Sequence, residues 1–94
     1  MYSTYVIHSI STDGIYIGQC NDLTDRLIRH NSNRNKSTAG KGPWELIFHR
    51  EFTTRREAVR LERKLKSFKN KKYLLEWIAK QSAEHPELPA SGES

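Results

Sequence analysis

The chain has 94 residues, a formal net charge of +5 and a single cysteine. A chain of this length forms one small domain, and one cysteine excludes both a disulfide framework and a cysteine-rich metal site. The N-terminus lacks a basic segment followed by an apolar run, and no stretch has the roughly 18 apolar residues of a membrane span, so we expect a cytoplasmic protein without a membrane segment.

The first predicted element is a β-hairpin. Residues 4–10 and 15–20 are rich in β-branched and aromatic side chains, and an Asp-Gly step lies between them. A loop with an even number of residues pairs positions whose numbers add to an odd value, such as Tyr5 with Cys20. Tyr5 and Tyr16 then lie on the same face. That face also carries Ser9, Gly18 and Cys20, and the opposite face carries the apolar residues Val6, Ile10, Ile15 and Ile17.

A helix is expected next, at 22–33, with Asp22 as its N-cap. The segment at 32–43 is a basic loop, because it is rich in Ser, Asn and Gly and contains almost nothing apolar. We expect a third strand at 45–52, where apolar and polar residues alternate.

The last part of the chain is predicted to be helical up to a tail. A capping box predicts a long helix at 54–68, and Asn70 is a candidate cap for a final helix that ends near residue 81. The segment at 82–94 contains two prolines and almost no large apolar residue, so we expect it to be disordered. The domain at 1–81 is predicted to be an α/β domain of the α+β type, with a short antiparallel sheet flanked by helices in the order β-β-α-β-α-α.

Two predicted helices carry a charged residue on or beside their apolar stripe. Glu62 lies one turn from Leu65, and a carboxylate there must be paired, hydrogen-bonded, bound to a cation or close enough to the rim to stay wet. Arg26 and His30 lie four residues apart and face the same side. The structural alternatives are a salt bridge for Glu62 and an arginine stem that packs and pairs with an acid. Opposite charges that converge on two tyrosines favour a functional site.

The hairpin tyrosines belong to two short motifs. Tyr16-Ile17-Gly18 lies in the second strand, and Thr4-Tyr5-Val6 lies in the first. With the spacing to Arg26 and His30 and the later helical Glu62, they resemble the motifs of the GIY-YIG nuclease superfamily, and in particular its small stand-alone bacterial members. In the first tripeptide only the tyrosine matches. The resemblance covers nearly all of the predicted domain and implies the family's three-stranded antiparallel sheet.

The resemblance also implies a role for each matched residue. It makes Tyr16 the general base and Tyr5 the residue that positions Tyr16 or the phosphate. Arg26 would grip the phosphate, and Glu62 would be the protein ligand of Mg²⁺ or Mn²⁺. His30 would support the attacking water or a phosphate oxygen, and a surface imidazole at the helix end is the alternative.

Basic residues are concentrated in the first 72 residues, which carry 15 of the 16 Lys and Arg but only 7 of the 11 Asp and Glu. Such a domain attracts polyanions, because phosphate neutralisation releases condensed counterions. A charged surface that only maintains solubility is the other interpretation. Beyond the catalytic set, the candidate nucleic-acid contacts are Gly18, Arg34, Lys36, Lys41, Arg55, Arg63, Lys66 and Lys69. Trp44 or Trp77 could stack on a base, although Trp77 fits an apolar stripe better.

Two functions compete at this point. The first is a metal-dependent endonuclease of low sequence specificity, with DNA as the expected substrate, acting on branched or damaged DNA in DNA repair or in nucleic-acid turnover. The second is a nucleic-acid-binding module of the same fold that cleaves poorly. The incomplete first tripeptide favours the second function. Asn70 favours it too: it is the candidate for the asparagine that follows the family's metal-binding glutamate, but its spacing from Glu62 is short and it could be only a helix cap. A protein-interaction domain fits the basic composition poorly, and a partner protein could supply targeting.

Overall fold

The computed structural model describes residues 1–83. Its elements are β1 (Tyr2–Ser9), β2 (Ile15–Cys20), α1 (Leu23–Asn31), β3 (Trp44–Phe52), α2 (Arg55–Lys66) and α3 (Lys71–Ala83). The predicted order of elements is confirmed, and α3 extends two residues past the predicted boundary at 81. The rest of the predicted disordered tail, 84–94, lies outside the described residues. Among residues 1–83, no helix is both long enough and apolar enough to cross a membrane.

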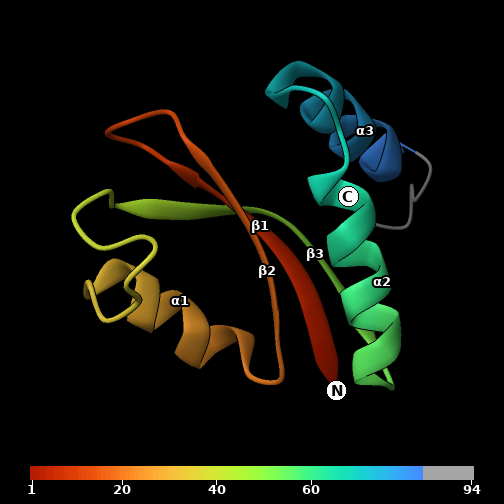
Figure 1. Cartoon of the computed structure of the whole chain (residues 1–94), viewed down its shortest axis with the longest axis horizontal. Helices are drawn as coiled ribbons and strands as arrows, with labels where there is room; N and C mark the ends of the chain where they lie inside the picture. Colours follow the sequence, from red (N-terminus) through yellow and green to blue (C-terminus); the bar gives the residue numbers. More distant parts are fainter. Residues whose placement is uncertain (84–94) are drawn as a thin grey trace, which may run out of the picture.

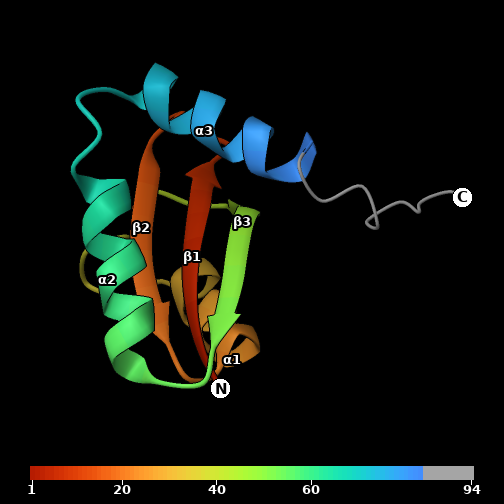
Figure 2. The same ribbon diagram turned by 90° about the vertical axis from the view of Figure 1, so that its right-hand side faces the viewer.

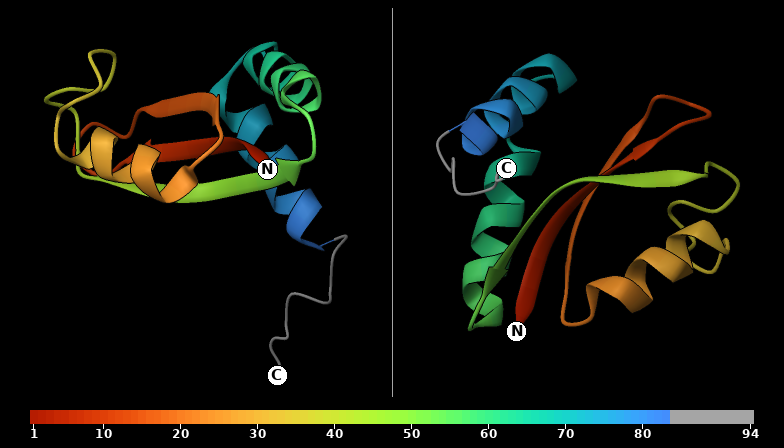
Figure 3. Two further views of the ribbon diagram at one scale, coloured as in Figure 1. Left: turned by 90° about the horizontal axis from the view of Figure 1, so that it is seen from below. Right: turned by 180° about the vertical axis from the view of Figure 1, so that it is seen from behind.

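The three strands form one antiparallel sheet in the order β2-β1-β3, so β2 and β3 are its edges. Helix α1 covers one face, and α2 and α3 cover the other (Figure 1). The view from behind shows the same separation of the helices by the sheet (Figure 3, right). Helix α2 runs along the β2 side of its face (Figure 2). The edge strand β2 is therefore where the two sides of the molecule meet.

The hairpin register differs from the predicted one by two positions. Tyr5 pairs with Gly18, not with Cys20, and Tyr16 pairs with Ile7. The predicted odd sum is nevertheless confirmed, because a shift of two leaves every side chain on its face. Tyr5 and Tyr16 therefore lie on the same face of the sheet, as predicted.

Each face of the sheet carries its own hydrophobic cluster. The cluster under α2 and α3 contains Val6, Leu61, Leu65, Leu74 and Ile78. The cluster under α1 contains Tyr5, Ile7, Cys20 and Trp44. Trp44 is only 7% exposed, so the prediction that it could stack on a base is wrong, whereas Trp77 packs against the first cluster as expected. Ile10, predicted on the apolar face, lies in the hairpin loop and is 60% exposed.

The helix starts are fixed by local side chains, largely as predicted. Asp22 accepts a hydrogen bond from the backbone N–H of Asp25 at 3.0 Å, and Asn70 accepts one from that of Tyr73 at 3.0 Å. The Thr54 hydroxyl accepts the backbone N–H of Glu57 at 3.3 Å. The reciprocal half of the capping box differs, because the Glu57 carboxylate accepts the Thr54 hydroxyl at 3.0 Å.

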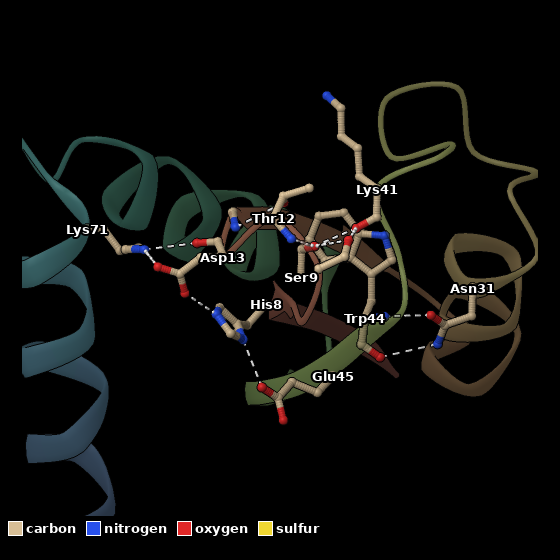
Figure 4. A network of polar contacts seen from close by, with 11 residues as sticks. His8, Ser9, Thr12, Asp13, Asn31, Lys41, Trp44, Glu45 and Lys71 are labelled. Atoms are coloured by element: carbon tan, nitrogen blue, oxygen red, sulfur yellow. Dashed lines mark hydrogen bonds and ion pairs between the residues drawn. The ribbon is translucent and has the colours of Figure 1, made fainter.

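The basic loop between α1 and β3 is held at both ends. The Asn31 side chain accepts from the backbone N–H of Trp44 at 2.7 Å and donates to its carbonyl at 3.3 Å. The hydroxyls of Ser9 and Ser11 donate to backbone carbonyls at the end of the loop, including that of Gly42 at 2.8 Å (Figure 4). These contacts keep the loop against the α1 face, beside the hairpin.

Candidate active site

A buried chain of hydrogen bonds lies under α1. The Tyr5 hydroxyl is bonded to His30 Nε2 at 2.8 Å, and His30 Nδ1 is bonded to the Thr38 hydroxyl at 2.7 Å. Tyr5 and His30 are fully buried, and Thr38 is 1% exposed. Both expectations for His30 therefore need correction, because a buried ring with both nitrogens bonded neither caps the helix at the surface nor reaches a water or a phosphate. It instead holds the Tyr5 hydroxyl.

Gly18 makes this arrangement possible by leaving space for Tyr5. A Cβ at this position would lie 2.7 Å from the Tyr5 hydroxyl oxygen and 3.1 Å from Tyr16 Cε2. Distances this short are not tolerated, so only glycine lets the Tyr5 ring cross β2 here. Gly18 is also buried. We therefore assign it to the packing of the two tyrosines, which corrects its prediction as a nucleic-acid contact.

Arg26, on α1, lies close enough to Tyr5 and His30 to affect the pKa of both, and it is partly exposed. Within residues 1–83 it forms no ion pair, so the alternative of an acid-paired arginine is not what the structure contains. A guanidinium without a carboxylate partner keeps its planar set of donors available for two phosphate oxygens.

The local environment shifts the titration of the two buried groups. Burial raises the pKa of the Tyr5 phenol above its ordinary value and the neighbouring Tyr16 adds to the rise, whereas Arg26 opposes it. Burial, and then the charge of Arg26, lower the pKa of His30. Both groups are therefore neutral near pH 7, which suits an imidazole that donates one hydrogen bond and accepts another.

Tyr16 lies beside this chain on the edge strand. Its ring centroid is 4.9 Å from that of His30 and 6.3 Å from that of Tyr5. Its hydroxyl makes no hydrogen bond to the part of the chain that the structure describes, and the side chain is only half-buried. Tyr16 is therefore the member of the tyrosine pair that a water or a substrate could reach.

Two surface grooves meet at Tyr16. The loop groove is lined by Thr12, Gly14, Ile15, Tyr16, Ser37, Thr38, Lys41 and Trp44. The helix groove is lined by Ile15, Tyr16, Ile17, Leu65, Lys66, Phe68, Asn70, Lys71 and Leu74. They lie on opposite sides of β2 and share Ile15 and Tyr16. An extended ligand that crossed this edge would therefore pass Tyr16 with lysines on both sides.

Glu62 comes from α2, on the other side of the sheet from the buried chain. Its carboxylate is 2.9 Å from Lys66 Nζ, and its side chain is 19% exposed. The predicted alternative of a salt bridge is thus present, with a lysine in place of an arginine. Among the described residues, no hydrogen bond or ion pair joins Glu62 to Tyr5, Arg26 or His30. Lys66, one turn later, lines the helix groove with Tyr16, so Glu62 lies one helical turn from a groove that contains the predicted base.

The basic residues predicted to contact nucleic acid are all exposed. They occupy four places: Lys41 in the loop groove, Lys66 in the helix groove, Arg34 and Lys36 in the loop, and Arg55, Arg63 and Lys69 on α2 and the turn after it. Arg55 and Arg63 line a third groove on the outside of α2, together with Arg56, Val59 and Arg60.

The sequence did not indicate a second polar network, at the tip of the hairpin. His8 Nε2 lies 2.6 Å from an Asp13 carboxylate oxygen, and His8 Nδ1 lies 2.8 Å from one of Glu45 (Figure 4). Lys71 donates to the other Asp13 oxygen at 2.6 Å and to the Asp13 carbonyl at 2.9 Å. These contacts tie the start of α3 to the hairpin loop that leads into Tyr16. His8 and Asp13 belong to one hairpin, but Glu45 and Lys71 come from distant parts of the chain, so no local pattern could have predicted the complete network. Thr38, which lies in the loop after α1, likewise has no signal in the sequence.

Comparisons with known proteins give a consistent result. A model of the GIY-YIG catalytic domain matches residues 1–74. The chain is 39% identical over 75 residues to a UPF0213 protein of Bacillus pumilus, covering 76% of both chains. It is 41% identical over 58 residues to the UPF0213 protein YazA of Bacillus subtilis, covering 61% of this chain and 59% of YazA. The solution NMR structure of a UPF0213 protein from Bacillus halodurans covers 99% of this chain with a TM-score of 0.53 and 24% identity, which supports the fold.

Proposed function

The chain belongs to the GIY-YIG catalytic domain family, and from that premise we propose that it is a divalent-metal-dependent endonuclease that hydrolyses nucleic-acid phosphodiesters. DNA is the expected substrate. The observation that carries the proposal is Arg26, which has no acid partner in the described chain and lies close to Tyr5, whose ring packs near that of Tyr16. We expect low sequence specificity, because the exposed lysines and arginines would mostly contact the backbone, and backbone contacts position a nucleic acid without reading its sequence.

Hydrolysis needs a water that loses a proton as it attacks phosphorus, and donors that offset the negative charge on the phosphate oxygens. The bond from phosphorus to the 3′-oxygen breaks in the same step, and the departing oxygen takes up a proton from solvent. Tyr16, as its phenolate, is proposed to take the proton, because its hydroxyl makes no hydrogen bond within residues 1–83 and the side chain lines both grooves. Arg26 would bind the phosphate oxygens through two parallel donors. Tyr5 would position Tyr16 or the phosphate, since the bond to His30 holds the Tyr5 hydroxyl in place.

Glu62 is the side chain proposed to hold Mg²⁺ or Mn²⁺. Mg²⁺ commonly keeps several waters and binds through one or two carboxylates plus substrate phosphates, so a single partly exposed carboxylate fits it. Within residues 1–83 there is no larger cluster of His, Cys, Asp and Glu that could replace it. The bound ion would stabilise charge on the phosphate oxygens. Lys66 would then exchange its carboxylate partner for a phosphate.

The test is a cleavage assay with single-stranded, duplex and branched DNA and RNA, in Mg²⁺, Mn²⁺ or EDTA. We expect metal-dependent products that Tyr16→Phe reduces about 100-fold or more, the scale of a lost general base. Arg26→Ala should also abolish cleavage, whereas the matched Arg29→Ala, an exposed position on the same helix, should not. Activity that survives Tyr16→Phe, Arg26→Ala and Glu62→Gln alike would refute the mechanism.

The second candidate is a nucleic-acid-binding module that cleaves poorly. The Glu62–Lys66 pair favours it, because a carboxylate already satisfied by a lysine is less available to a metal ion. The two candidates differ in one outcome. A protein that shifts the nucleic acid on a gel but yields no product with either metal would be the binding module.

A further inference from the structure

A groove on the far side of the turn between α2 and α3 has no part in the function proposed above. This turn groove is lined by Ser67, Phe68, Lys69, Tyr73, Glu76, Trp77 and Lys80. Aromatic rings and lysines in one groove are the combination that holds a nucleic-acid strand, since the rings stack on bases and the lysines neutralise phosphates. We propose that the turn groove is a stacking subsite for one unpaired base of the strand that Tyr16 acts on. The proposal rests on the proposed function.

Tyr73 is the ring that a base would stack on. It lies in the first turn of α3, is 51% exposed and belongs to neither hydrophobic cluster. Trp77 forms a wall of the turn groove and is not itself free to stack. Its ring packs edge-on against Phe48, with the ring centroids 5.3 Å apart, and Lys64 Nζ lies 5.5 Å from the Trp77 centroid. A tyrosine that is half exposed leaves part of its ring accessible to a base.

The charges around Tyr73 suit a phosphate chain. Lys69 and Lys80 line the groove, and Glu76 is the single acid that lines it. Lys64, over the Trp77 ring, adds a third cation at its margin. A base stacked on Tyr73 has a phosphate on either side. The lysines around the groove are therefore placed to neutralise the phosphates of a bound strand.

The turn groove adjoins the groove that contains Tyr16. Phe68 lines both the turn groove and the helix groove, and Lys66, Asn70 and Lys71 line the helix groove together with Phe68 and Tyr16. The turn after α2 lies next to the start of β2 (Figure 2). A strand that leaves Tyr16 along the helix groove therefore reaches Tyr73 directly, with lysines along the way.

The test is fluorescence anisotropy in EDTA, so that no cleavage occurs, with a labelled oligothymidylate and an abasic chain of the same length. Stacking is worth about 1–3 kcal/mol per base, so Tyr73→Leu should weaken oligothymidylate binding about 5- to 150-fold and leave abasic binding unchanged. Tyr73→Phe, which keeps the ring, should bind as the wild type does. Lys80→Gln should weaken binding of both probes more than Lys72→Gln, which makes the same charge change on α3 outside the groove.

Each outcome bears on one of the two proposals. Equal binding by Tyr73→Leu and the wild type would overturn the stacking subsite and leave the endonuclease untouched. Tyr73-dependent binding by a protein that yields no product with either Mg²⁺ or Mn²⁺ would refute the endonuclease and leave Tyr73 as a stacking subsite of a binding module. A wild type that binds neither probe would refute the subsite and leave the endonuclease to its own cleavage assay. Displacement of the oligothymidylate by polyglutamate, with the same loss in Tyr73→Leu, would identify a surface for acidic proteins and overturn the subsite.

Discussion

Gly18 determines how closely Tyr5 can approach the edge strand. The two residues are cross-strand partners, and the Tyr5 ring occupies the space where any other residue at position 18 would have its Cβ. The Tyr5 hydroxyl can reach His30 only because residue 18 has no Cβ in that space. The glycine of the second tripeptide is therefore a packing requirement of the tyrosine of the first.

We expect Gly18→Ala to displace Tyr5 from His30. Overpacking of this kind costs about 1–3 kcal/mol, so the free energy of unfolding measured in urea should fall by that amount, and cleavage should fall with it. The same substitution in a Tyr5→Leu background should cost less, because the crowded phenol is absent. An equal cost in both backgrounds would contradict the assignment.

Thr38 supports the site from the loop that precedes β3. Thr38→Val keeps the shape of the side chain but leaves His30 Nδ1 buried without a partner. The expected loss in the free energy of unfolding is about 1–3 kcal/mol. Thr24→Val, at an exposed position on α1, is the matched control and should change stability little. Equal effects of the two substitutions would show that the buried chain contributes nothing.

At the scale of elements, polar contacts attach the hairpin to both α3 and β3. His8 bonds to Asp13 and Glu45, and Lys71 at the start of α3 bonds to Asp13 (Figure 4). The Asp13 bond, followed by the Glu45 bond, raises the pKa of His8, and the bonds from His8 and Lys71 lower the pKa of Asp13 to about 2. The network is therefore complete only while His8 is protonated and Asp13 is ionised.

The stabilisation from this network should depend on pH. Because the pKa of His8 is raised in the folded state, its contribution is fully present below its ordinary pKa of about 6.5 and is lost as the pH rises through the raised value. The contribution of Asp13, whose pKa is lowered, is fully present above its ordinary pKa of 3.8 and is lost as the pH falls through the folded value of about 2. The Tm difference between the wild type and His8→Gln should therefore be larger at pH 5.5 than at pH 8.5. His49→Gln, at an exposed position on β3, is the control, and a pH-independent His8→Gln effect would refute the interpretation.

At the scale of the whole molecule, the cations surround the edge strand β2 and the outside of α2. Lysines line the grooves on both sides of Tyr16, and four arginines line the outer groove of α2. Binding of nucleic acid should therefore weaken steeply with salt, since each phosphate contact releases about one counterion. Arg56→Gln should lower the slope of log Kd against log salt by about 1 if it contacts a phosphate, as measured by anisotropy at several salt concentrations. Affinity that does not change with salt would contradict this account.

The sequence by itself determined the local features of this protein. The order of the elements, the caps at Asp22 and Asn70, and the shared face of Tyr5 and Tyr16 follow from residue periodicity and turn chemistry, which act within a few neighbouring residues. For the hairpin register, the sequence correctly predicted only that the numbers of paired residues add to an odd value. Parity decides the face of each side chain, whereas the partner of each residue depends on the length of the loop.

Only the tertiary structure decided which groups meet. His30 is buried because Thr38 folds back from a loop that shows no apolar signal, and Gly18 is needed because Tyr5 crosses from the next strand. Glu62 lies on the opposite side of the sheet from His30, although both belong to one motif in the sequence. These relations depend on packing across the sheet between residues distant in sequence, and periodicity along a single element carries no information about such contacts.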